Sequence, residues 1–145
     1  MTPVRFREVI APPLWLLAFI YFLFTSISIS LWAALGNAPA LWSQIILTCA
    51  LIYIAIRSRM IIEVDEFELR INDAHIEHTY LGEVKVLDAL AMRNARGPDA
   101  DPSAYLALRF WCPTGVLIKV KDSRDTTPYW LISSKRNDEF AKALN

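Results

Sequence analysis

The stretch from residue 12 to residue 56 constrains this chain most, because it contains no charged residue and is almost wholly apolar. It is interrupted once, at Gly36-Asn37-Ala38-Pro39. As a helix, the run Leu14–Leu35 would extend roughly 33 Å, and the hydrocarbon core of a bilayer is about 30 Å thick. The pattern therefore predicts two membrane-spanning helices, over about residues 13–35 and 40–57, joined by a tight turn.

The second apolar run, residues 41–56, is shorter and would extend only about 24 Å as a helix. We expect interfacial residues at its ends to lengthen it and the first helix to pack against it. A cleaved signal peptide is disfavoured, because the first run exceeds the roughly 7–15 residues of a signal h-region and a second run follows at once.

Basic residues flank the predicted hairpin on both sides. Arg5 and Arg7 precede the first helix, Arg57 and Arg59 follow the second, and residues 36–40 carry no charge. The positive-inside rule then puts both termini in the cytoplasm. We expect a multi-pass protein of the inner (plasma) membrane.

Polar residues inside the two helices are expected to face the partner helix. Ser26 and Ser30 share one helix face, as do Gln44 and Thr48. Counted from the turn, Ser30 lies level with Gln44, and Ser26 with Thr48, so we expect these pairs to meet. A transport role is disfavoured, because proton and ion paths usually need an ionisable residue within a span.

From residue 61 onward the apolar pattern changes to a period of two, which is typical of half-buried strands. His78 and Tyr80 are expected on one face of the third strand. A short helix is predicted over residues 88–95, capped by Asp88 and with Leu90 on its apolar side. The predicted strands cover residues 61–64, 67–71, 74–80, 84–87, 105–111, 116–121 and 129–133.

The chain is expected to end in an amphipathic helix from about residue 138, capped by Ser134 or Asn137 and burying Phe140, Ala141 and Leu144. A bent antiparallel sheet must close on itself or be covered, and one terminal helix over the end of a small barrel achieves this. The predicted fold is therefore α+β: a membrane hairpin in residues 1–59 and a soluble β domain in residues 60–145. This arrangement resembles a pleckstrin-homology-like (PH-like) barrel held at a membrane.

The chain also resembles an uncharacterised actinobacterial family of two-span membrane proteins, domain of unknown function 3093. The resemblance rests on Leu87-Asp88-Ala89 with Arg93 and Gly97, Asp101-Pro102 with Tyr105, Arg109-Phe110-Trp111, and residues 127–136. The chain departs from the family pattern at residues 125–128, where an Asp-Pro step usually precedes the Thr-Pro. The resemblance implies a membrane location and lends nothing on mechanism.

Two groups of residues after the hairpin are candidates for binding. Asp99, Asp101, Asp122 and Asp125 lie on two loops and, if the loops meet, would bind a hard cation or pair with arginines. Tyr129 and Trp130 are adjacent on a strand, so one ring faces the core and the other faces away from it. An outward Trp would be a partner anchor. The alternative is that both rings are covered, one by the core and one by the terminal or the internal helix. The candidate partner-binding residues are Arg93, Asp101, Arg109, Trp111, Asp122, Asp125, Tyr129 and Trp130.

No motif in the sequence predicts a reaction, a metal or a cofactor. His75 and His78 are three apart, so on a strand they point to opposite faces and cannot share a metal locally. Cys49 lies in the second apolar run and Cys112 in the soluble part, so a reducing compartment is the simplest interpretation. The formal net charge is zero, which gives no bulk attraction to nucleic acid.

The sequence therefore favours a non-enzymatic membrane protein whose soluble domain binds or scaffolds a protein partner. Two alternatives remain open at this point. One is a lipid-headgroup sensor using the basic residues near Arg57 and Arg59. The other is an enzyme with an unrecognised site.

Overall fold

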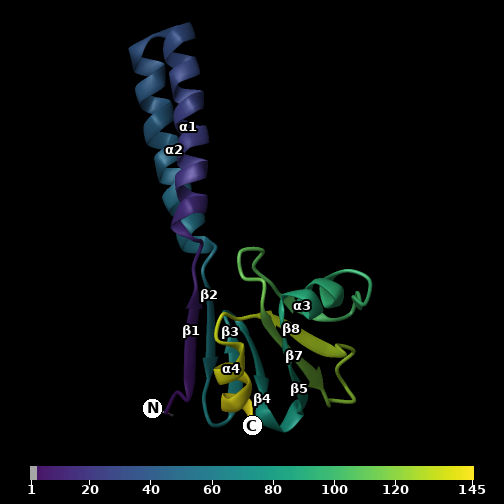
Figure 1. Ribbon diagram of the computed structural model, residues 1–145. Coiled ribbons are helices and arrows are strands. Elements are labelled where there is room, and N and C mark those ends of the chain that lie inside the picture. Colours follow the sequence, from purple (N-terminus) through teal and green to yellow (C-terminus); the bar gives the residue numbers. More distant parts are fainter. Residues whose placement is uncertain (1–2) are drawn as a thin grey trace. The chain divides into compact units, whose positions relative to one another are not determined.

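The computed structural model describes residues 3–145 and divides into two compact units (Figure 1). The hairpin unit is Ala11–Arg59. The two-sheet unit combines the residues before Ala11 with Met60–Asn145. The chain thus leaves the two-sheet unit, forms the hairpin and returns.

The hairpin unit consists of α1 (Leu14–Leu35) and α2 (Asn37–Arg57). Gly36 alone connects them, with a φ of +89° that side-chain-bearing residues rarely adopt. Its N–H donates to the Trp32 carbonyl, and Trp32 Nε1 donates to Asn37 Oδ1 at 2.6 Å across the turn. One glycine therefore reverses the chain, and two polar contacts secure the reversal.

The second helix is longer than the sequence predicts. It begins at Asn37 rather than near residue 40, because Pro39 lies in its first turn, where a missing N–H costs nothing. Its 21 residues extend about 31 Å, close to the length of α1.

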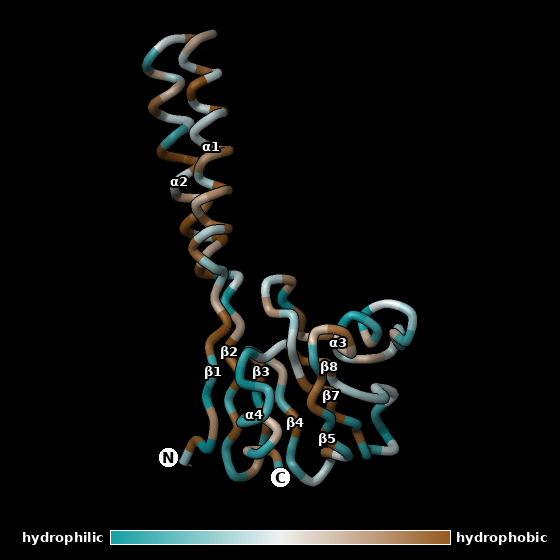
Figure 2. The backbone as a smooth tube through the Cα atoms, viewed as in Figure 1, coloured by the Kyte–Doolittle hydropathy of each residue, from teal (hydrophilic) through white to brown (hydrophobic). Residues whose placement is uncertain are grey.

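Both helices are long and apolar enough to cross a membrane by length and composition. Figure 2 shows hydrophobic colours along most of both. Only 6% of the most apolar 18-residue window of each helix is buried within the structure.

The first sheet is wholly antiparallel, in the order β1-β2-β3-β4. Its strands are β1 (Phe6–Ile10), β2 (Met60–Val64), β3 (Glu68–Ile71) and β4 (Ala74–Glu77). The second sheet has the order β5-β7-β8-β6, and its short edge strand β6 runs parallel to β8. Its strands are β5 (Leu81–Leu87), β6 (Tyr105–Ala107), β7 (Gly115–Val120) and β8 (Tyr129–Ser133).

The N-terminal strand corrects the predicted domain division. We assigned residues 1–59 to the hairpin, but β1 pairs with β2 along its whole length, with Ile10 opposite Met60. Residues 1 and 2 lie outside the described part of the chain. Phe6, Glu8 and Ile10 are buried while Arg7 and Val9 are exposed, so β1 contributes one face to the soluble core.

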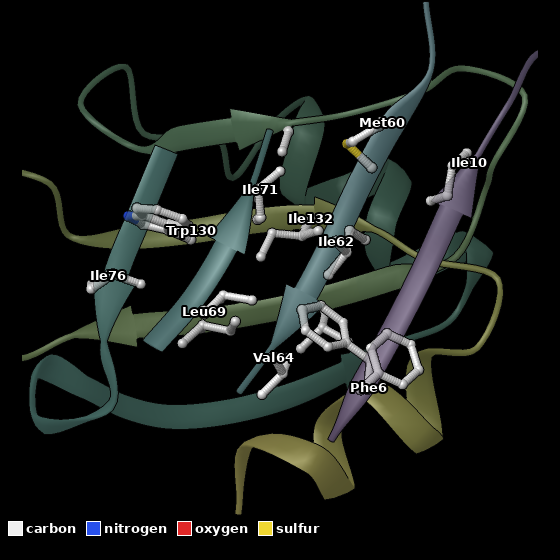
Figure 3. Close-up of a cluster of buried hydrophobic side chains, with 14 of the residues drawn as sticks. Phe6, Ile10, Met60, Ile62, Val64, Leu69, Ile71, Ile76, Trp130 and Ile132 are labelled. Carbon is white, nitrogen blue, oxygen red and sulfur yellow. The ribbon is translucent and has the colours of Figure 1, made fainter. Parts of the chain in front are cut away.

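The described residues form no closed barrel, contrary to the prediction. A 3-10 turn, η1 (His78–Tyr80), follows β4 and leads the chain into β5, which starts the second sheet. One apolar core lies between the sheets, and Figure 3 shows first-sheet side chains pointing toward Trp130 and Ile132. The C-terminal helix α4 (Asn137–Leu144) adds Phe140, which stacks on Phe6 with 5.3 Å between ring centroids.

Some of the predicted helices and strands are confirmed, and others end earlier or begin elsewhere than the sequence predicts. Helix α3 (Ala89–Arg96) is confirmed, with Asp88 Oδ1 accepting from Ala91 N at 2.8 Å. The predicted strand 74–80 ends at Glu77, and the predicted strand 105–111 ends at Ala107. Helix α4 begins after Arg136 and has no side-chain cap. Leu144 is only partly buried.

Candidate partner-binding surfaces

The polar seam of the hairpin differs from the prediction. Ser26 and Ser30 are exposed and donate to carbonyls of their own helix, and Thr48 does the same within α2. The contacts between helices are Ser43 Oγ to Ser28 Oγ at 3.0 Å and Gln44 Nε2 to Thr25 Oγ1 at 3.5 Å. Gln44 was thus predicted at the interface correctly, but with the wrong partner.

A hollow in the two-sheet unit brings together two of the predicted site residues, Asp122 and Asp125. They lie on the loop between β7 and β8, and the hollow of about 220 Å³ is also lined by His75 and Glu77 of β4 and by Tyr80 of η1. We call it the acidic cleft. His75 and His78, expected on one strand, belong to β4 and η1 respectively.

Hydrogen bonds hold the loop that carries these carboxylates. Asp122 Oδ1 accepts from Arg124 N at 2.9 Å, and Asp125 Oδ1 accepts from Thr127 N at 2.8 Å. Arg124 also reaches η1, where its Nη2 donates to Tyr80 Oη at 3.1 Å. The Thr127 N–H lowers the pKa of Asp125 below its ordinary value, so this side chain is ionised at neutral pH.

The acidic cleft carries three carboxylates, from Glu77, Asp122 and Asp125, against one arginine that already pairs with Asp122. Residues 3–145 contain no group of three His, Cys, Asp or Glu side chains arranged to hold a metal ion. The cleft therefore offers an exposed negative surface suited to positively charged groups.

Asp101 and Tyr129 meet each other in a separate place. Asp101 N donates to Tyr129 Oη at 3.0 Å, and Asp101 Oδ1 accepts from Ser103 N at 2.8 Å. Tyr129 and Asp99 also line a hollow of about 310 Å³ beside α3. These contacts shape the loop after α3.

Trp130 does not face outward, which agrees with the alternative that its ring is covered and removes it as a partner anchor. It is only 7% exposed, and its ring lies 4.4 Å from that of Tyr105, centroid to centroid. Burial raises the pKa of Tyr105. Trp111 is partly buried against the core, and within residues 3–145 its Nε1 has no hydrogen-bond partner.

Two of the most exposed large apolar side chains of the two-sheet unit lie elsewhere, one on α3 and one on the loop between β6 and β7. Leu90, expected on the buried side of its helix, is 67% exposed, and Met92 is buried instead. Phe110 is also 67% exposed. A hollow of about 350 Å³ is bordered by Leu90, Arg93, Arg96 and Pro113. Arg109, on the loop between β6 and β7, is held by β8, since its N–H donates to Ser133 Oγ at 3.0 Å. We use the name α3–loop patch for Leu90, Arg93, Arg96 and Pro113, which border this hollow, together with Phe110, which lies three residues before Pro113 on the same loop.

Sequence reasoning missed Glu8, which is only 7% exposed. Its Oε2 accepts from Ser134 Oγ at 2.5 Å and its Oε1 accepts from Lys135 N at 3.0 Å. Glu8 therefore joins β1 to the segment between β8 and α4. The one available signal was its position between Phe6 and Ile10 in an alternating apolar pattern.

A family model described as "Protein of unknown function (DUF3093)" matches residues 5–144. The match covers both the hairpin and the two-sheet unit. No curated protein and no solved structure matches the chain.

Proposed function

Because this chain belongs to the DUF3093 family, whose description assigns no function, we propose from its geometry that it is a non-enzymatic, membrane-anchored binding module. In this proposal the hairpin crosses the inner (plasma) membrane twice. The two-sheet unit binds a positively charged segment of a protein partner in the acidic cleft, on the cytoplasmic side.

The exposed apolar surface of the hairpin supports the membrane anchor. A core helix of a soluble protein would have most of its apolar side chains covered, whereas only 6% of each apolar window is buried here. Lipid would cover such a surface. The flanking arginines at positions 5, 7, 57 and 59 favour cytoplasmic ends.

The pairing of β1 with β2 supports a hairpin topology independently of charge. These strands precede and follow the two helices and lie side by side over five residue pairs. The chain must therefore emerge on the side of the membrane from which it entered. An even number of crossings satisfies this requirement.

A PH-like architecture is part of the proposal. Two sheets enclose one core, and a C-terminal helix packs against it, in contact with β5, β7 and β1. This arrangement supports a compact binding module, although a fold alone does not define a function.

The convergence of Glu77, Asp122 and Asp125 on one hollow is the observation that carries the proposed binding role. Each comes from the rim of a sheet, where a partner has access. Asp125 is held ionised by a backbone N–H, and a carboxylate with a lowered pKa is a weak general base at neutral pH. The same group is well suited to pairing with a lysine or arginine.

Site-specific crosslinking in native membranes tests this role. A photoreactive amino acid replaces the exposed cleft residue His75 in the full-length chain, and Asn145 serves as the control position. We expect a discrete protein adduct at position 75 that weakens with salt, because exposed ion pairs are screened.

A matched pair of charge variants makes the test specific. Asp122→Asn with Asp125→Asn keeps the oxygens that accept loop N–H groups but removes two charges, and should abolish the adduct. Asp73→Asn with Asp99→Asn removes two charges elsewhere and should preserve it. Equal adducts in both variants, or none above the control position, would contradict the proposal.

A further inference from the structure

The α3–loop patch presents large apolar side chains next to arginines on the surface of the two-sheet unit. Leu90 and Phe110 are each 67% exposed, and Arg93 and Arg96 border the same hollow as Leu90 and Pro113. Both apolar side chains project although each has a buried neighbour nearby in the chain. Met92 and Cys112 are fully buried.

Both parts of the patch, α3 and the loop between β6 and β7, are held in place by contacts with the rest of the two-sheet unit. Asp88 caps α3, and Met92 anchors it against the second sheet near Gly115. The loop is held at Thr114, whose carbonyl accepts from Ser134 N at 3.0 Å and whose Oγ1 donates to Ser134 O at 2.7 Å. Phe110 rests edge-on against Trp111, with 4.9 Å between ring centroids. Phe110 is therefore presented to its surroundings rather than folded inward.

The loop between β6 and β7 also lies at the end of the two-sheet unit where β1 and β2 connect to the hairpin. Thr114 of this loop bonds to Ser134, and Ser134 Oγ donates to Glu8, two residues before Ile10 at the end of β1 that connects to the hairpin. Figures 1 and 3 show the segment between β6 and β7 passing near these strand ends. Three residues separate Ile10 from α1, a reach of at most roughly 14 Å. A bilayer that holds α1 is thus within reach of this end.

From this combination we infer that the α3–loop patch contacts the surface of an anionic phospholipid bilayer. This inference goes beyond the proposed protein-binding role and rests on the membrane anchor of the proposed function. Phe110 and Leu90 enter the boundary between headgroups and acyl chains, and the guanidinium groups of Arg93 and Arg96 bind lipid phosphates.

The patch has fewer than the about 4–8 clustered basic residues usual in autonomous lipid-binding segments. Its contact is weak alone, but the hairpin keeps it at the membrane, where a high effective concentration makes a weak contact sufficient. The patch therefore orients the two-sheet unit relative to the membrane, while the hairpin keeps the unit there.

The orientation has a consequence for the acidic cleft. Strand β5 begins after Tyr80 at the cleft and ends at Leu87, just before α3. Seven residues of strand extend about 20 Å, so patch and cleft lie at opposite ends of β5. When the patch rests on lipid, the cleft is directed away from an anionic surface that would repel its carboxylates.

The test uses the full-length protein in vesicles of phosphatidylcholine with phosphatidylglycerol. An environment-sensitive fluorophore is attached at Ala89→Cys, which is exposed beside the patch, or at the control site Thr126→Cys on the cleft side. Cys49→Ser removes the exposed native thiol, and Cys112 is buried. We expect lipids with a spin-labelled headgroup region to quench the label at position 89 and to leave position 126 bright.

Variants then assign the contact to the patch. Leu90→Ser with Phe110→Ser should abolish quenching at position 89, and the exposure of both residues means that the fold is kept, as circular dichroism would verify. Arg93→Gln with Arg96→Gln should lose the dependence on phosphatidylglycerol. Equal quenching at both positions, or quenching unchanged by the serine variants, would overturn the inference. Shielding of position 89 in native membranes without quenching by lipid would assign the patch to a protein and overturn it too.

Discussion

At the scale of single residues, Glu8 joins two segments that lie far apart in the sequence. It connects the strand before the hairpin to Ser134 and Lys135 near the other end of the chain. A buried carboxylate is tolerated only when it is hydrogen-bonded. Both its oxygens are engaged here, so the cost of burying it is offset by joining β1 to the C-terminal segment.

We expect Glu8→Ala to lower the free energy of unfolding by about 2–3 kcal/mol, because Ser134 Oγ and Lys135 N would lose a charged acceptor in a buried place. Chemical denaturation in detergent micelles measures this. Glu66→Ala is the control, since Glu66 is exposed and lies 3.9 Å from Arg5; its effect should stay within about 0.5 kcal/mol. Equal effects of the two substitutions would refute the structural role of Glu8.

Asp65 gives the two-sheet unit a pH-dependent contribution. Its Oδ1 accepts from the N–H groups of Phe67 and Glu68, both at 2.8 Å, in the turn between β2 and β3. These bonds lower its pKa below the ordinary value of 3.8. Since the folded-state pKa is the lower one, the stabilisation is complete above the ordinary value and is lost as the pH falls through the folded value.

We therefore expect the stability difference between the wild type and Asp65→Asn to be constant near neutral pH and to shrink below about pH 4. Denaturation curves at several pH values measure it, and carbon NMR of the carboxyl group follows the titration directly. A stability difference that grows on acidification, or a carboxyl pKa above 3.8, would reverse the assigned sign.

At the scale of elements, the hairpin separates two kinds of serine. Ser28 is 6% exposed and bonded to Ser43 between the helices, whereas Ser26 is exposed and bonded within α1. Small residues at such an interface let the helices approach closely. The seam, and not the predicted Ser26–Thr48 pair, determines the distance between α1 and α2.

Ser28→Leu should consequently weaken the hairpin by about 1–3 kcal/mol, because the larger side chain cannot fit between the helices. Ser26→Leu adds the same volume on an exposed face and should change stability by less than about 0.5 kcal/mol. Unfolding by increasing sodium dodecyl sulfate compares the two proteins. A larger loss of stability from Ser26→Leu than from Ser28→Leu would instead support the predicted contact between Ser26 and Thr48.

Local sequence patterns predicted those elements that depend on neighbouring residues, such as the apolar helices and α3 with its Asp88 cap. They failed where distant segments decide. Strand β1 forms by pairing with β2, which follows the whole hairpin in the sequence. The local patterns also left the position of Trp130 open, because β8 is an inner strand covered on both faces, with Trp130, Leu131, Ile132 and Ser133 all buried. Alternation then no longer separates an inner from an outer face.

At the scale of the whole molecule, the proposed topology puts Asn37 on the opposite side of the membrane from the two-sheet unit. A membrane-impermeant maleimide applied to intact cells or spheroplasts should label Asn37→Cys in a Cys49→Ser background. Ser123→Cys, exposed on the two-sheet unit, should react only after permeabilisation. Labelling of position 37 only after permeabilisation would reverse the orientation.

The pairing of β1 with β2 has a consequence for how the protein is made. In the proposed topology, strand β1 is synthesised before the hairpin and cannot pair with β2 until residues 11–59 have been made and inserted into the membrane. If only one helix entered the bilayer, β1 and β2 would lie on opposite sides of the membrane, and Glu8 would lack its hydrogen-bond partners. We therefore expect that only a chain with both crossings in place completes the first sheet and becomes resistant to cellular proteases.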